Sequence, residues 1–231
     1  MNVRDLMGFH VDALFTHDAK GQLLRGNEPS GAEAPRFFLG RTADGSVIRF
    51  RHDVDDDTRR ELEAAANDDA MNAAPRDSPT NALRFEEILA RTAPVRNTSL
   101  GPAFSFPPGL AAPTDAVLVT DHNVQVLDAF LRDWIPDVRI GQPLFALVVG
   151  ERAVAVCCTV RRTSEAHEAG VETVPAFRGQ GYAAQVVTAW ARAVRENGQV
   201  PLYSTSWQNE ASRAVARKLG LIQFGNDLHV T

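Results

Sequence analysis

The sequence predicts a mixed α/β (α+β) fold, in which a central mixed sheet is flanked by helices and preceded by an N-terminal α+β extension. Two apolar runs, Leu144–Val149 and Ala153–Val160, are as continuous as strands that are buried on both faces. Apolar side chains recur along one stripe of residues 181–196, which predicts an amphipathic helix. Over residues 114–231 the predicted order is β-α-β-β-β-α-β-α-β, which is typical of a mixed sheet.

The other elements of this region follow from their local patterns. Residues 123–134 are predicted to be helical because four apolar side chains share one face: Val126, Leu127, Phe130 and Leu131. The remaining predicted elements are strands over 116–120, 167–174, 200–206 and 221–230, the last interrupted near Gly225, and a helix over 209–219.

The N-terminal half shows the pattern of a small α+β unit. Runs at residues 36–41 and 46–51 flank Ala43-Asp44-Gly45, which is a hairpin signal. Thr58-x-x-Glu61 fits a capping box and predicts the start of a helix. The other predictions here are the end of that helix near residue 66, a loop over 67–80 and a short helix over 81–91.

Residues 97–113 are predicted to be a connector between two domains. This span contains four prolines and two glycines, which neither continue a helix nor fit inside a central strand. Phe104 and Phe106 suggest that the connector packs on something apolar. We therefore expect an N-terminal α+β region of unknown role over 1–113 and a second domain over 114–231.

Composition and charge restrict the class of protein. The chain has 231 residues, of which 44% are hydrophobic, and its net charge is -5, with no basic excess in either half. A broad nucleic-acid surface is therefore not expected. Apolar runs are too short for a membrane helix, and no signal-peptide pattern opens the chain. We expect a cytoplasmic protein without nucleic-acid or membrane partners.

No metal site or disulfide is predicted. The only cysteines, Cys157 and Cys158, are adjacent and would point to opposite faces of a strand. The acidic run Asp53–Asp57 suggests a metal site, but carboxylates at a helix start are favoured by its dipole in any case. The six histidines have no metal-ligand spacing.

The chemically informative segment lies between a predicted strand and a predicted helix. It runs from Val174 through Arg178, Gly179 and Gly181 to Ala183. Glycines at such a junction let a ligand approach the backbone, and the N–H groups of the first helical turn then face it. This arrangement predicts a site for a phosphate or pyrophosphate.

Two known patterns compete for this segment. Gly179-x-Gly181-x-x-Ala184 matches the Rossmann dinucleotide fingerprint. However, four residues separate it from the strand, and the acidic residue expected about twenty positions later is missing. The second pattern, Arg/Gln-x-x-Gly-x-Gly/Ala, is satisfied by Arg178, Gly181 and Ala183.

The second pattern resembles the acyl-coenzyme A loop of the GNAT acetyltransferase superfamily. A later block, Trp207–Leu221, is similar to the family's strand-helix motif, in which an asparagine opens a helix that ends in Lys-x-Gly-Phe. Here these positions are Asn209 and Lys218-Leu219-Gly220-Leu221. The two blocks occur in the family's order, and the resemblance covers about residues 114–231.

The resemblance implies that the parallel strands at 167–174 and 200–206 splay apart around acetyl-CoA. It places the pyrophosphate on the loop and the pantetheine arm beside the backbone of Thr173 and Val174. Asn209 and Ser212 would contact the cofactor from the other wall. The loop residues implied in cofactor binding are Arg178, Gly179, Gln180, Gly181, Tyr182 and Ala183.

Acetyl transfer to a primary amine requires a neutral amine, so a general base is useful. Glu172, on the splayed strand, is the first candidate base, and Glu168, four residues earlier on the same face, is the second. The N–H of Val174 is expected to hold the oxyanion. In many family members a tyrosine acts as the general acid at the position of Ala216 in this chain. Tyr203 is the candidate that would take over this role.

The predicted function is therefore acetyl-CoA-dependent N-acetyl transfer by direct attack of the acceptor amine. A small-molecule amine and a peptide N-terminus are both open as acceptors, and a homodimer is open as the assembly. A catalytically silent acyl-CoA-binding sensor or interaction module is the alternative, favoured by the missing tyrosine. A nicotinamide cofactor on a Rossmann loop is the third interpretation.

Overall fold

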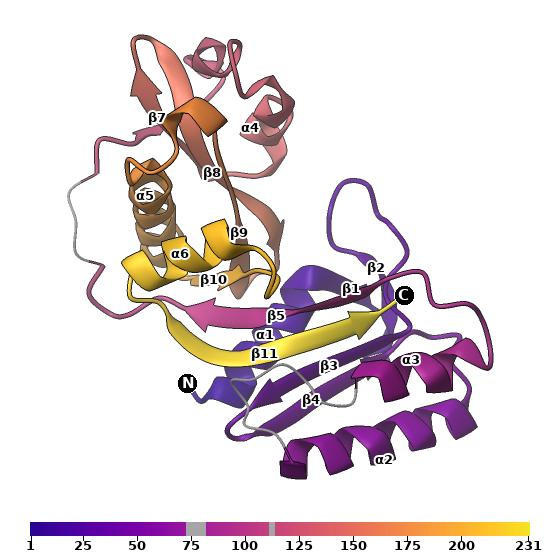
Figure 1. Cartoon of the computed structure of the whole chain (residues 1–231). Coiled ribbons are helices and arrows are strands. Elements are labelled where there is room, and N and C mark those ends of the chain that lie inside the picture. Colours follow the sequence, from indigo (N-terminus) through magenta and orange to yellow (C-terminus); the bar gives the residue numbers. More distant parts are fainter. Residues whose placement is uncertain (73–81, 111–113) are drawn as a thin grey trace. The chain divides into compact units, whose positions relative to one another are not determined.

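The computed structural model describes residues 1–72, 82–110 and 114–231 (Figure 1). The chain forms two compact units. The first consists of Met1–Ser105, Ser204–Glu210 and Ile222–Thr231, and the second of Phe106–Tyr203 and Ala211–Leu221. This division differs from the predicted one at residue 113, because the last strand of the chain pairs with strands of the N-terminal half.

The first unit contains an antiparallel sheet of order β4-β3-β11-β5. The predicted hairpin is confirmed, since β3 and β4 pair in full register from Phe37↔Phe50 to Thr42↔Gly45. The elements of this unit are α1 (Val3–Leu14), β1 (Phe15–His17), β2 (Leu23–Gly26), β3 (Phe37–Thr42), β4 (Gly45–Phe50), α2 (Asp56–Asn72), α3 (Ala82–Ala90), β5 (Thr98–Ser105) and β11 (Ile222–Val230).

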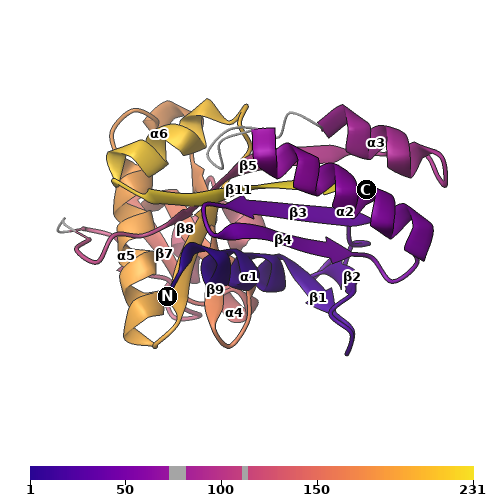
Figure 2. The same cartoon turned by 90° about the horizontal axis from the view of Figure 1, so that it is seen from below.

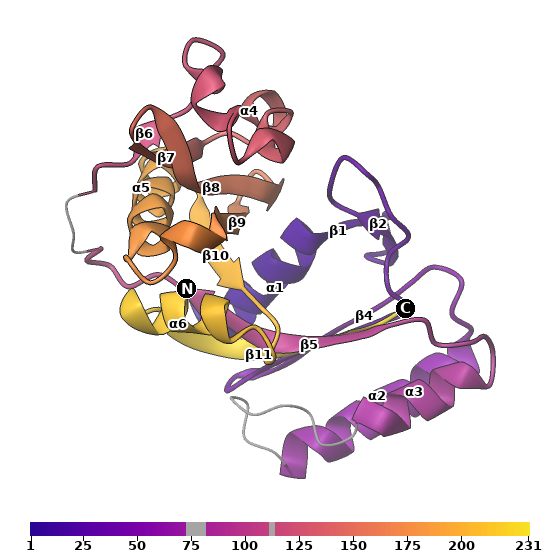
Figure 3. The same cartoon turned by 45° about the horizontal axis from the view of Figure 1, so that its top comes forward.

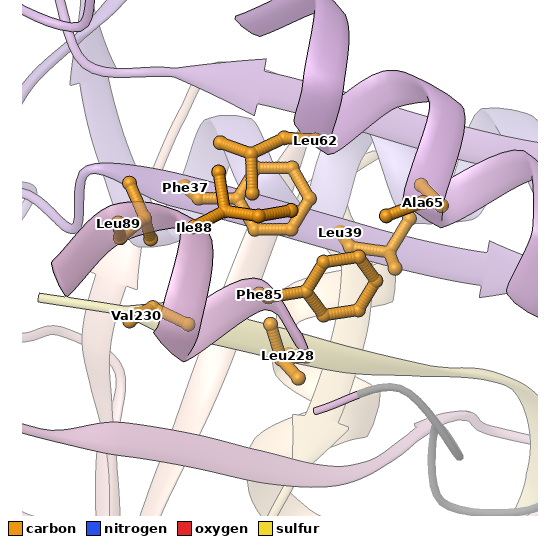
Figure 4. Close-up of a cluster of buried hydrophobic side chains, with 10 residues drawn as sticks. Phe37, Leu39, Leu62, Ala65, Phe85, Ile88, Leu89, Leu228 and Val230 are labelled. Atoms are coloured by element: carbon orange, nitrogen blue, oxygen red, sulfur yellow. The ribbon is translucent and has the colours of Figure 1, made fainter. Parts of the chain in front are cut away.

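Helices cover both faces of this sheet. α2 and α3 lie on one face and α1 on the opposite face (Figure 2). Side chains from the two helices and from β3 and β11 pack together on the α2/α3 face because alternate strand residues point to it (Figure 4). The fully or nearly fully buried members of this cluster are Phe37, Leu39, Leu62, Ala65, Ala66, Phe85, Ile88, Leu89, Leu228 and Val230.

The opposite face holds a buried polar pair beneath α1. His10 Nε2 of α1 hydrogen-bonds Asp227 Oδ2 of β11, and both side chains are buried. His229 Nε2 lies 3.8 Å from the other oxygen, Asp227 Oδ1. Met7 of α1 packs where a side chain at Gly40 would stand, so the glycine permits close approach of helix and sheet.

Two predictions about the first half are wrong. Pro102 and its neighbours form a strand, β5, although a connector was expected. The strand tolerates Pro102 because its carbonyl still accepts from the N–H of Thr205 at 3.3 Å. The cap of α2 is Asp55, whose carboxylate accepts from the backbone and the hydroxyl of Thr58, so the predicted capping box at Thr58 does not form.

Helix boundaries in the same region are also partly corrected. α2 extends to Asn72, past the predicted end near residue 66, so residues 67–72 are helical where a loop was expected. Residues 73–80 of that predicted loop lie outside the described residues. The second predicted helix is confirmed as α3.

The second unit contains a mixed sheet of order β10-β9-β8-β7-β6, in which β10 and β9 are parallel and the other neighbours antiparallel. The predicted strands are confirmed, β7 with the predicted ends and the others with changed ends. Its elements are β6 (Val117–Leu118), η1 (Val124–Leu127), η2 (Arg132–Trp134), α4 (Asp137–Ile140), β7 (Leu144–Val149), β8 (Arg152–Arg162), β9 (Ala166–Thr173), η3 (Pro175–Phe177), α5 (Tyr182–Glu196), β10 (Val200–Ser204) and α6 (Glu210–Lys218).

The two faces of this sheet carry different elements. α5 lies on one side of β7 and β8, and the segment with α4 lies on the other (Figure 3). The continuous helix predicted over 123–134 is wrong: two 3₁₀ segments, η1 and η2, stand in its place. They still bury Leu127 and Leu131 against β7 and β8, whereas Phe130 of the predicted apolar face is 45% exposed.

A chain of buried hydrogen bonds fixes α5 on the sheet. Trp190 Nε1 donates to Thr159 Oγ1 at 3.0 Å, and that hydroxyl lies 3.1 Å from His167 Nδ1. α5 is also tied to the segment that follows β5, because Arg195 donates to the carbonyl oxygens of Phe106 and Pro107 at 2.7 and 2.8 Å. These bonds hold the middle and the last turn of α5 in place.

The two cysteines are expected to be unreactive in the folded protein. Both side chains are buried, and burial raises the pKa of Cys157 and of Cys158 well above that of a free thiol. The thiolate is the reactive form. A thiol reagent at pH 8 should modify neither cysteine in native protein and both after denaturation, as counted by mass spectrometry. Rapid labelling of the native protein would contradict this.

Candidate active site

Two neighbouring parallel strands of the second unit, β9 and β10, are paired over only part of their length. Their register begins with Val200 opposite Ala166 and ends with Leu202 opposite Glu168. β9 continues to Thr173, so the strands separate beyond Glu168 in the described chain. The expected splay of two parallel strands is therefore confirmed.

The open edge of β9 presents the backbone of Thr173. The N–H of Val174 donates to the carbonyl of Val154 at 2.9 Å, and its own carbonyl accepts from the N–H of Phe177 at 2.9 Å. Bonded and non-bonded residues alternate along an antiparallel pair, so the N–H of Thr173 points away from β8. The expectation that the Val174 N–H holds an oxyanion is wrong, because the sheet already uses that N–H.

The glycine loop forms the start of α5, as predicted. Gly179 and Gly181 have φ of 79° and 82°, in the left-handed region that glycine enters without strain. Gly181 is the N-cap, and no side chain of the described residues caps this helix start. The first intrahelical bond runs from Gln185 to Gly181, so the N–H groups of Tyr182 and Ala183 face out along the helix axis.

A lysine adds positive charge to this helix start. A side chain at Gly181 would collide with Nζ of Lys218, which reaches back from the last turn of α6. Among the described residues, Lys218 makes no ion pair that would neutralise its ammonium group. The amide groups, the helix dipole and this ammonium together favour an anion beside Gly181.

The neighbouring side chains shape the same loop. Nε of Arg178 donates to the carbonyl of Thr173 at 3.2 Å, and the Tyr182 hydroxyl donates to Gln180 Oε1 at 2.8 Å. Thr173 Oγ1 is buried and has no hydrogen-bond partner in the described chain. An unsatisfied hydroxyl, an open strand edge and a helix start fit a ligand that combines a phosphate group with an amide-containing arm.

Glu172 lies on the face of β9 opposite α5. Its side chain is exposed, and Oε2 accepts a hydrogen bond of 2.6 Å from Nε1 of Trp134 in η2. Glu168 shares this face because it lies an even number of residues away on the same strand. It is only 2% exposed and stands at the last pair formed with β10. Of the two candidate bases, Glu172 is therefore the one whose side chain is exposed to solvent.

Tyr203 is buried between β10 and α6. Its hydroxyl lies 2.7 Å from Ser212 Oγ, and burial raises its pKa to about 12, although the Ser212 hydrogen bond acts to lower it. Ala216 of α6 is also buried, so the family's tyrosine position is filled by a small core side chain. The structure brings Tyr203 and Ser212 together, in a contact that stabilises the packing of α6.

Asn209 belongs to the first unit and directly precedes α6. It is exposed, and its backbone N–H donates to the carbonyl of Ser206 at 3.1 Å. The start of α6 is therefore where the sequence placed it. The cofactor contact expected for Asn209 stays a prediction.

Two residues of this site were missed by sequence reasoning. The sequence predicts Trp134 only as part of a helix. Its hydrogen bond to Glu172 joins residues that are 38 apart in sequence. Lys218 was noticed only as part of the motif that ends the last helix. No local pattern reports either contact, because each depends on how a helical segment packs on β9 or α5.

Comparison with known proteins adds to this geometry. Residues 145–226 match the family model described as GNAT acetyltransferase, and this segment includes both splayed strands and the glycine loop. This segment is therefore similar to a GNAT acetyltransferase domain.

Solved structures agree with this fold. A GNAT-family protein from Novosphingobium aromaticivorans aligns with a TM-score of 0.50 at 17% identity, covering 59% of this chain and 65% of its own. The aligned part thus spans just under two thirds of that protein. An acetyltransferase of the GNAT family from Colwellia psychrerythraea has a TM-score of 0.51 at 14% identity, covering 87% of this chain and 82% of its own. No curated protein matches the chain.

Two features are absent from the described residues. None of their helices has both the length and the apolar character needed to cross a membrane. Nor do they contain a group of three or more His, Cys, Asp or Glu side chains arranged to hold a metal ion.

Proposed function

We propose that this protein is an N-acetyltransferase, which transfers the acetyl group of acetyl-CoA to a primary amine by direct attack. The observation that carries the proposal is the match of residues 145–226 to the GNAT acetyltransferase model, because the matched segment contains the splayed strands and the loop. Acetyl-CoA supplies an activated thioester when it is bound. Residues of this chain would supply binding of the two substrates and the transfer of protons.

The helix start and the open strand edge would bind the cosubstrate. The N–H groups of Gly181, Tyr182 and Ala183 would donate to its pyrophosphate, with Lys218 beside them. The unsatisfied hydroxyl of Thr173 would pair with the pantetheine arm. Charge and hydrogen-bond direction support this orientation.

Glu172 would prepare the acceptor amine. A lysine-type ammonium has a pKa of ~10.4, so at neutral pH a base must remove its proton before the nitrogen lone pair can attack. The carboxylate of Glu172 accepts that proton, the C–N bond forms, and the C–S bond breaks with its electron pair on the leaving thiolate. The second proton of the attacking nitrogen is released to solvent. The N–H of Thr173 would stabilise the oxyanion of the tetrahedral stage.

Tyr203 is a weak choice for the acid that protonates the departing thiolate. Its pKa is raised to about 12, whereas an ordinary thiol has a pKa of ~8.5. Proton transfer from Tyr203 to a thiolate is therefore uphill. We propose that the thiolate leaves without a protein acid, which its low basicity allows. A small-molecule amine and a peptide N-terminus both fit this chemistry as acceptors.

A silent acyl-CoA sensor is the second candidate function. It is favoured by the buried Ala216 at the family's tyrosine position and by the engagement of the Tyr203 hydroxyl with Ser212. Turnover separates the two functions. An enzyme would consume acetyl-CoA, and at least one amine of a broad panel would increase the rate of consumption. A sensor would bind acetyl-CoA tightly without turnover.

Replacing Gly181 with glutamate is expected to abolish acetyl-CoA binding. The new carboxylate would stand beside Lys218, where a pyrophosphate would otherwise bind, and repel it. Losing the charged hydrogen bonds of the loop should weaken binding roughly 100-fold or more, on the order of 3 kcal/mol. Calorimetry with acetyl-CoA, CoA and NADH measures this directly.

The matched control is Gly198→Glu at the other end of the same helix. Gly198 has a similar φ of 84°, so the backbone strain and the added charge match those of Gly181→Glu, but its new side chain meets open space instead of Lys218. The Gly198→Glu variant should bind acetyl-CoA with the affinity of the wild type. No binding of any of the three ligands by wild-type protein would show that the loop is only a turn, and preferential binding of NADH would restore the Rossmann interpretation.

A further inference from the structure

Trp134 contacts the proposed active-site strand in two ways. Its indole N–H donates to Oε2 of Glu172 at 2.6 Å. Its ring lies over Gly170, where an added Cβ would come within 3.2 Å of Trp134 Cη2. Gly170 and Glu172 lie on the same face of β9, so one indole ring covers the strand at both residues.

This contact restrains a side chain that would otherwise move freely. Glu172 is exposed, and an exposed glutamate samples several rotamers. Trp134 is half-buried and packs against the cluster beneath β7 and β8. Its backbone is fixed as well, because its N–H donates to the carbonyl of Leu131 at 3.0 Å. The donor is therefore rigid, and it holds one oxygen of a mobile carboxylate.

We propose that Trp134 is a positioning residue for proton removal by Glu172. The indole N–H holds Oε2, and the other oxygen, Oε1, is left to accept the proton of the acceptor. The proton leaves the attacking nitrogen, or a water in its place, and forms an O–H bond on Glu172. This proposal rests on the proposed function, in which Glu172 is the base.

The first measurement tests the hydrogen bond without using activity. In ¹⁵N–¹H spectra, the indole N–H signal of Trp134 is the one lost in Trp134→Phe. It should shift in Glu172→Gln, because a neutral amide replaces the charged acceptor. The signal of Trp190 should stay in place, since its acceptor is the Thr159 hydroxyl. An unmoved Trp134 signal would overturn the proposal.

The second measurement tests the role of the bond through hydrolysis of acetyl-CoA, with water as the probe acceptor. Trp134→Phe keeps an aromatic ring but removes the donor, so the rate should fall about 10-fold while the Kd for acetyl-CoA stays within about twofold. The same substitution in a Glu172→Gln background should have no further effect. A structural role would instead give additive losses that follow the melting temperature.

The remaining outcomes separate this inference from the proposed function. A normal rate in Trp134→Phe with a reduced rate in Glu172→Gln refutes the positioning role and keeps the base. Equal rates in all three proteins refute Glu172 as the base and the inference with it. Binding of acetyl-CoA with no hydrolysis in any form, even with an amine panel, identifies a sensor and overturns both.

Discussion

Glu172→Gln is expected to lower the rate of acetyl transfer by roughly 10²- to 10⁴-fold, which is the usual contribution of a general base. Glutamine keeps the size of the side chain but cannot accept the proton from the amine. The Kd for acetyl-CoA should be unchanged, because Glu172 lies on the face of β9 opposite α5. The rate is measured by release of free CoA, and the Kd by calorimetry.

Two further variants make this result decisive. Glu165→Gln changes an exposed carboxylate just before β9 and should leave the rate unchanged. Glu168→Gln changes a buried carboxylate on the same face, and its effect should appear mainly in stability. A normal rate in Glu172→Gln combined with a lost rate in a folded Glu168→Gln protein would transfer the role of base to Glu168.

Asp227→Ala is expected to destabilise the protein by about 3–5 kcal/mol, which is the usual cost of removing one partner of a buried polar pair. Asp227 is 5% exposed and hydrogen-bonds His10, which is fully buried under α1. Without the carboxylate, His10 Nε2 would be left in an apolar setting among Phe38 and Phe224. Urea unfolding at pH 7 gives the free energy of unfolding.

The matched control is Asp44→Ala in the exposed turn between β3 and β4, which should change stability by less than about 0.5 kcal/mol.

The His10–Asp227 pair also predicts that stability depends on pH. Burial acts to raise the pKa of Asp227, but the hydrogen bond and charge of His10 and the charge of His229 outweigh it, so the pKa is lowered. A carboxylate with a lowered pKa stabilises the fold above its unfolded pKa of about 3.9, and this stability is lost as the pH falls further.

The wild type should therefore lose stability below about pH 4 more steeply than Asp227→Ala, which has no such group to protonate. Parallel unfolding curves of the two proteins between pH 5 and pH 2.5 would show that the pair contributes no pH-dependent stability.

Much of the second unit could be predicted because its signals are local. The apolar run Leu144–Val149 became β7 with the predicted ends, and the stripe over 181–196 became α5. The glycine loop was also recognisable, since Gly179 and Gly181 are needed wherever the chain takes a positive φ before a helix. These features depend on a few neighbouring residues, which the sequence contains.

The errors arose where distant residues decide the local structure. Pro102 is compatible with a strand only because Thr205 and Asn226 flank it, and both are more than a hundred residues away. In the segment 123–134, packing on β7 and β8 buries Leu127 and Leu131 through 3₁₀ turns and leaves Phe130 exposed. An apolar pattern specifies which side chains are buried, but several backbone paths can bury them.

For the candidate site, the sequence by itself determined the glycine loop, the strand that carries Glu172 and the likeness to a GNAT domain. Only the tertiary structure decided that the Val174 N–H is already used, that Lys218 stands beside Gly181 and that Trp134 holds Glu172. The physical reason is the same in each case. Backbone conformation follows from near neighbours, whereas a hydrogen bond or a charge contact between elements exists only after the elements have packed.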